Sequence, residues 1–68
     1  MRMYLNNDEN YANMKSHIEY MTVDQLYDLG SLLKKENPTN YTETVRLRIL
    51  NILISKKIQE IKSLSEIM

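Results

Sequence analysis

The chain has 68 residues, with nine basic residues balanced by nine acidic ones and a formal net charge of zero. It contains no Cys, and His17 is its only His, which excludes a disulfide-stabilised domain and a thiolate or His-rich metal site. The neutral total argues against a dedicated nucleic-acid binder, because such domains usually carry a basic surface. We expect one helical domain, 1–68, stabilised by close packing or by association, because so short a chain buries only about 60% of its unfolded surface.

Residues with A/T-rich codons are abundant: there are seven Asn, seven Ile, six Lys and five Tyr, against one Ala. The source genome is therefore expected to be A/T-rich, as in many low-GC bacteria and their phages. No apolar segment approaches the length of about 18 residues expected of a membrane helix, and the polar first ten residues do not resemble a signal peptide. With the lack of Cys, these features predict a cytoplasmic protein with no membrane partner.

The periodicity predicts three helices over about 8–21, 23–36 and 40–66, after a flexible or weakly ordered lead over 1–6. Asn7 or Asp8 can cap the first helix, whose apolar residues recur at spacings of three and four: Tyr11, Met14, Ile18 and Met21. Thr22 and Gln25 form a T-x-x-Q capping box for the second.

The third helix has two candidate starts. Asn37 can cap it with Pro38 in the first turn, or Asn40 can cap it with Glu43 completing the box. Its stretch Val45–Ile54 is apolar in nearly every direction around the helix axis, and such a helix is normally buried all round. The two shorter helices cover only part of it, so a second copy of the chain or another protein is expected on the remaining side. The predicted fold is thus all-α: a short N-terminal helix and a helical hairpin ending in a long C-terminal helix, in a dimeric bundle.

The expected interface combines this stretch with tyrosines, which are enriched at binding hot spots. A buried Asn51 is costly unless it is paired, and one way to pair it is with the Asn51 of a second copy near a two-fold axis, as a polar residue does in some coiled coils. Arg46 and Arg48 have two possible roles. Either they contact an anion or a carboxylate of a partner, or their aliphatic parts pack on apolar surface while their guanidinium groups stay in water. The interface residues are predicted to be Tyr20, Tyr27, Val45, Arg46, Arg48, Ile49, Leu50, Asn51, Ile52 and Leu53.

No residue pattern indicates catalysis. The single Gly cannot build a phosphate-binding loop, and no nucleophile motif occurs. His17 has no Ser, Asp or second His nearby in the sequence, and Asp24 with Asp28 offers only two carboxylates. We therefore predict no enzyme activity, cofactor, metal or small-molecule ligand. The expected function is a protein–protein interaction module that acts as an adaptor, inhibitor or regulator of a bacterial or phage-targeted protein.

One segment suggests an alternative. Thr42-Glu43-Thr44-Val45-Arg46, with Ile49, resembles the start of the second helix in ribbon-helix-helix DNA-binding proteins. The resemblance spans about 15–54 and implies a strand in which Ile18, Tyr20 and Thr22 alternate, followed by a helix bearing Leu26, Leu29 and Leu32. It implies a DNA-binding transcriptional regulator, and it needs a strand where the spacing of the first helix predicts helical backbone.

Overall fold

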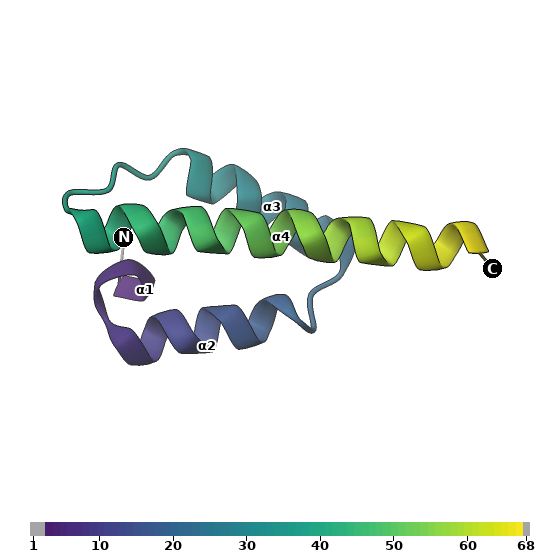
Figure 1. Cartoon of the computed structure of the whole chain (residues 1–68), viewed down its shortest axis with the longest axis horizontal. Helices are drawn as coiled ribbons and strands as arrows, with labels where there is room; N and C mark the ends of the chain where they lie inside the picture. Colours follow the sequence, from purple (N-terminus) through teal and green to yellow (C-terminus); the bar gives the residue numbers. More distant parts are fainter. Residues whose placement is uncertain (1–2, 68) are drawn as a thin grey trace.

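The computed structural model describes residues 3–67, which form four helices (Figure 1). They are α1 (Met3–Asn6), α2 (Asp8–Ile18), α3 (Val23–Lys34) and α4 (Tyr41–Ile67). α4 has 27 residues and contacts each of the other helices, and its C-terminal part extends beyond them (Figure 1). The predicted all-α fold is confirmed, and the three longer helices match the predicted ranges to within three residues at each end.

The N-terminal lead differs from expectation. Residues 3–6 form the four-residue α1, and Leu5 is completely buried. A helix this short has no stability of its own, so its conformation depends on packing against α2 and α4. That dependence explains why local patterns in the sequence did not indicate it. Residues 1 and 2 of the lead lie outside the described residues.

α2 begins as predicted but ends three residues early. The side chain of Asn7 accepts a hydrogen bond of 3.0 Å from the backbone N–H of Asn10 and caps the helix. After Ile18, the next three backbone N–H groups bond to carbonyl oxygens three residues earlier, a tightening that is common at helix ends. Met21 therefore lies in the connection to α3, although it still packs against the core.

α3 begins at the predicted capping box. The hydroxyl of Thr22 accepts a bond of 3.2 Å from the N–H of Gln25, and the Gln25 side chain accepts one of 2.9 Å from the N–H of Thr22. Because the Thr22 backbone is extended and its N–H is committed to this contact, α2 cannot run on into α3. α3 ends at Lys34, and a connection over residues 35–40 that contains Pro38 leads to α4.

Asn40 caps α4, which decides between the two candidate starts. Its side-chain oxygen accepts a bond of 2.9 Å from the N–H of Glu43. The carboxylate of Glu43 reaches back beyond Asn40 and accepts bonds of 3.0 and 3.1 Å from the N–H and the hydroxyl of Thr39. Glu43 is buried, so these bonds fasten the connection from α3 against the start of α4.

The core lies between α4 and the other helices. Its members are all aliphatic, and fully burying such a side chain stabilises a fold by about 1.5–3 kcal/mol. They are Leu5, Ile18, Leu26, Leu29, Leu33, Leu50 and Ile54.

The strand implied by the ribbon-helix-helix resemblance does not form. Residues 16–18 belong to α2, and residues 19–22 form the connection to α3. No strand occurs anywhere in residues 3–67. The DNA-binding alternative therefore lacks its recognition element in the described part of the chain.

Candidate protein-binding groove on α4

One side of α4 is buried and the opposite side faces solvent. Leu50 and Ile54 lie in the core. Ile52, about half a turn from Leu50 on an α-helix, is 51% exposed, and Ile49 is 37% exposed. The uncovered side of the stretch Val45–Ile54 is therefore the side that carries Ile49 and Ile52.

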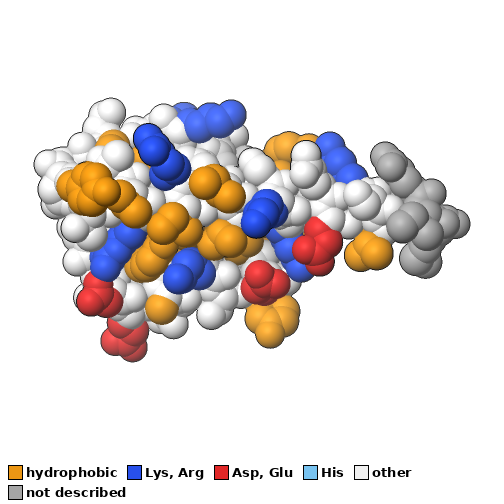
Figure 2. All heavy atoms as spheres, in the orientation of Figure 1, with side chains coloured by type: hydrophobic (Ala, Val, Ile, Leu, Met, Phe, Trp, Pro, Cys, Tyr) orange, Lys and Arg blue, Asp and Glu red, His pale blue; other side chains and the backbone are white. Residues whose placement is uncertain are grey.

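Apolar side chains continue along this uncovered side towards the start of α4. Tyr41 is 82% exposed and Val45 is half-buried. Spacings of four, four and three residues connect Tyr41, Val45, Ile49 and Ile52, which returns their side chains to one side of the helix. We call these four residues the outer face of α4. Figure 2 shows hydrophobic side chains interspersed with Lys and Arg over the N-terminal half of α4.

Two hollows lie beside this face. The larger, about 540 Å³, runs along α4 from Thr44 to Gln59 and includes Leu47 and Ile52. The smaller, about 310 Å³, lies between α3 and α4, with a lining that includes Leu26, Tyr27, Gly30 and Ile58. Asn51 and Ser55 line both hollows. The two hollows therefore adjoin at these residues, and together we call them the α4 groove.

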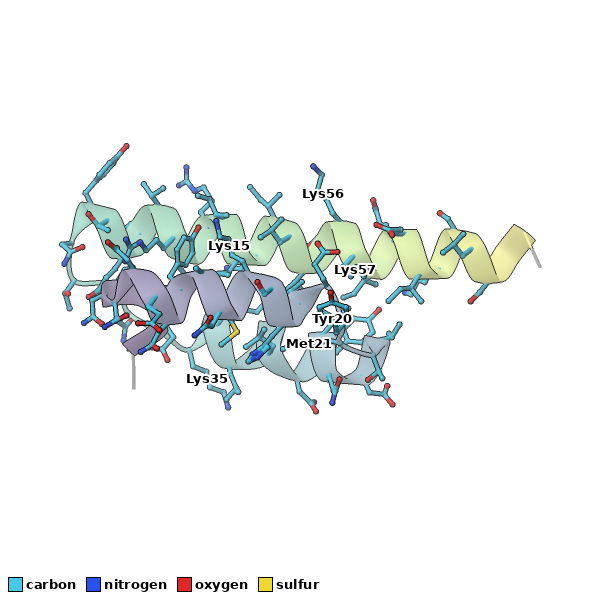
Figure 3. The ribbon with its side chains drawn as sticks, turned by 90° about the horizontal axis from the view of Figure 1, so that it is seen from below. Lys15, Tyr20, Met21, Lys35, Lys56 and Lys57 are labelled. Carbon is cyan, nitrogen blue, oxygen red and sulfur yellow. The ribbon has the colours of Figure 1, made fainter. Side chains whose placement is uncertain are left out.

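The charge lining the groove is entirely positive. Arg48 and Lys56 line the larger hollow and Lys34 lines the smaller one, whereas no Asp or Glu among the described residues lines either. None of the three forms an ion pair with a described residue. Lys56 points away from α2 and α3 in Figure 3. The groove thus combines exposed apolar surface with three cations that the described protein does not neutralise.

The two arginines predicted at the interface have different surroundings. Arg46 donates a hydrogen bond of 2.9 Å to the backbone carbonyl oxygen of Leu5 and forms an ion pair with Asp8. Its guanidinium carbon lies 4.9 Å from the centre of the Tyr11 ring. Arg46 is therefore engaged within the protein, where it holds α1 and α2 to α4. Arg48 is exposed and remains available to a partner.

Leu50 and Leu53 are not on the groove surface. Leu50, which was predicted at the interface, is 0% exposed and belongs to the core that α4 shares with the other three helices. Leu53 is partly buried and packs against the core. Asn51 is half-buried between the two hollows, and its side chain makes no hydrogen bond with the described residues. Its pairing with a second copy stays a prediction.

The two tyrosines also differ. Tyr27 lines the smaller hollow, and its hydroxyl accepts a bond of 2.8 Å from the Nζ of Lys62. That contact ties the extending part of α4 to α3. Tyr20 is 88% exposed in the connection after α2 and does not line the groove. In Figure 3 it lies on the same side of α4 as Lys57, which pairs with Glu19 at 3.7 Å.

Several groove residues were not anticipated. Lys56 continues the four-residue spacing of Arg48 and Ile52, so the sequence did contain a signal for it. Gly30 and Lys34 carried no such signal, because their position beside Asn51 depends on how α3 packs on α4.

Other kinds of site find no support among the described residues. No group of three or more His, Cys, Asp or Glu side chains is placed to hold a metal ion in residues 3–67. No described helix combines the length and apolar character needed to cross a bilayer. Comparison of the chain with protein-family models, curated proteins and solved structures found no match. The α4 groove is therefore the feature on which a functional proposal rests.

Proposed function

We propose that this protein is a non-catalytic protein–protein interaction module, an adaptor, inhibitor or regulator, that binds another protein through the α4 groove. The observation that carries the proposal is Ile52, which is 51% exposed in a hollow also lined by polar and charged side chains. Apolar side chains surrounded by a polar rim are typical of protein-binding sites.

The dimensions of the groove suit such a partner. The groove covers residues 44–59 of α4, a length of about 24 Å at 1.5 Å per residue. A specific interface buries roughly 800 Å² on each partner, and the whole accessible surface of this protein is 5102 Å². One partner lying along the groove would thus cover about a sixth of the surface, leaving the remaining surface for a second contact if the protein is an adaptor.

Photo-cross-linking in cells of the source organism tests the proposal. A cross-linking residue is placed at Ile52 in one variant and at Leu32 in a control. Leu32 is 59% exposed on α3 and does not line the groove. A discrete cross-linked protein is expected from position 52 and not from position 32.

The cross-linked partner is then purified, and its binding to this protein is measured for variants of the groove. Binding to Ile52→Ser should be at least about tenfold weaker than to the wild-type protein, because an apolar anchor is lost. Binding to Leu32→Ser should be unchanged. Equal cross-linking from both positions, or a purified partner indifferent to Ile52→Ser, would contradict the proposal.

A further inference from the structure

Positive charge is concentrated on one part of α4. Residues 44–59 contain no acidic residue but four basic ones: Arg46, Arg48, Lys56 and Lys57. Arg46 is paired with Asp8, and Lys57 lies 3.7 Å from Glu19 and 3.6 Å from Glu60. The other two, Arg48 and Lys56, line the α4 groove. Within residues 44–59, the two basic residues outside the groove thus have acidic partners, whereas the two that line it have none among the described residues.

We propose that the α4 groove binds an amphipathic helix of a partner protein in which acidic side chains flank an apolar stripe. This inference rests on the proposed function and names the chemistry of the partner. The apolar stripe would lie on Leu47 and Ile52, and its carboxylates would face Arg48, Lys56 and Lys34. Helix-in-groove binding takes its affinity from apolar contact, and complementary charge sets the orientation and the association rate.

A second copy of the chain is a less favourable occupant. If two α4 helices pair antiparallel through their outer faces and cross at Ile52, Arg48 of one copy lies opposite Lys56 of the other. In a parallel pair the same residues meet their own counterparts. The segment 44–59 supplies no carboxylate in either arrangement, and like charges brought together across an interface are destabilising. The predicted homodimer, if it forms, is therefore expected to use another surface.

Nucleic acid and lipid fit the groove less well than an acidic helix. Protein surfaces that bind nucleic acid are strongly basic and polar, whereas this chain is neutral overall and Leu47 and Ile52 line the groove. A bilayer presents a broad surface, and it cannot send side chains into the hollow between α3 and α4. The amide of Asn51 and the hydroxyl of Ser55 line both hollows, where they can hydrogen-bond to an inserted polar group.

Selection from a peptide library tests the proposed chemistry. The library displays helical peptides of about 16 residues, a length that matches the groove, and it has no bias in charge. Peptides that bind are selected on the full-length protein. The selected peptides are expected to be net acidic with an apolar stripe. In fluorescence anisotropy their affinity should fall at least about tenfold in the Arg48→Glu/Lys56→Glu variant. It should also fall as the salt concentration rises from about 50 to about 300 mM.

Three controls make the outcome interpretable. Arg48 and Lys56 are exposed, so circular dichroism of the double variant should match that of the wild-type protein. Leu32→Ser should leave peptide affinity unchanged. Ile52→Ser separates the two proposals. Selected peptides that need Ile52 but show no acidic bias would overturn the partner chemistry and leave the proposed function standing. If the affinity of the selected peptides does not change in Ile52→Ser, or if no peptide binds, the partner chemistry and the proposed function are both overturned.

Other occupants are tested in parallel. The proposal is overturned if no acidic peptide binds and the protein instead binds a DNA or RNA oligonucleotide, or a vesicle of anionic phospholipid, with an affinity that is lost in Arg48→Glu/Lys56→Glu. A dimer seen in sedimentation and dissociated by Ile52→Ser would also overturn it, because a second copy would then occupy the groove.

Discussion

The guanidinium of Arg46 donates a hydrogen bond to the backbone carbonyl oxygen of Leu5, which lies 41 residues earlier in the chain. The same side chain pairs with Asp8 at the start of α2 and lies over the ring of Tyr11. One residue of α4 thus contacts both N-terminal helices. α1 is too short to be stable alone, so this contact and the burial of Leu5 are what hold it in place.

Replacing Arg46 with Ala is expected to lower the free energy of unfolding by about 1–3 kcal/mol, because the Leu5 carbonyl loses a charged donor. The ion pair adds little, since the Asp8 side chain is 91% exposed. Arg48→Ala is the matched control and should change stability by less than about 0.5 kcal/mol. Urea denaturation followed by circular dichroism measures both variants. Equal effects would show that Arg46 does not anchor α1.

Glu43→Ala is expected to destabilise the protein by about 1–3 kcal/mol, because the N–H and the hydroxyl of Thr39 lose the carboxylate that accepts their hydrogen bonds. Asn40→Ala removes only the helix cap and should cost about 1 kcal/mol. Thermal unfolding resolves the difference, since 1 kcal/mol shifts the Tm of a domain this size by about 4–8 °C. A Glu43→Ala variant with wild-type Tm would mean that the connection over 35–40 is held by other contacts.

Leu50 and Ile52 are two residues apart, and their truncation should have opposite consequences. Leu50→Ala is expected to cost about 2–5 kcal/mol, because it leaves a cavity in the core. Ile52→Ala should cost less than about 1 kcal/mol, since Ile52 is half-exposed, and should weaken binding of the selected acidic peptides. Chemical denaturation and anisotropy report the two effects. If Ile52→Ala proved the more destabilising, the assignment of Leu50 to the buried side of α4 and of Ile52 to the open side would be wrong.

Gly30→Ala is expected to stabilise the protein by about 0.5–1 kcal/mol, because Ala favours a helix interior over Gly. The added Cβ would lie 4.0 Å from the Cγ2 of Ile54, an ordinary contact, and Gly30 has no positive φ that would strain Ala. Gly30→Leu exceeds that space and should lose the gain. Differential scanning calorimetry gives both values. A lower Tm for Gly30→Ala would indicate closer packing of α3 on α4 than this distance allows.

Local signals predicted the helices well. The capping bonds that start α3 and α4 join residues only three positions apart, Thr22 with Gln25 and Asn40 with Glu43. They depend only on the local sequence. Contacts across long separations could not be predicted in this way. The bond from Arg46 to Leu5 depends on where α1 packs, and no pattern within α1 indicates that position.

The sequence by itself determined that the chain is helical, that α3 begins after Thr22, that α2 and α4 begin within a few residues of their observed starts, and that Val45–Ile54 exceeds what two short helices can cover. Only the tertiary structure decided which side remains open. A helix that is apolar all round has no single preferred buried side, so the choice depends on where α1, α2 and α3 pack against α4. That packing buries Leu50 and leaves Ile52 exposed. It also brings Lys34 to the groove that Arg48 and Lys56 share, which makes the open side basic in a chain with no net charge.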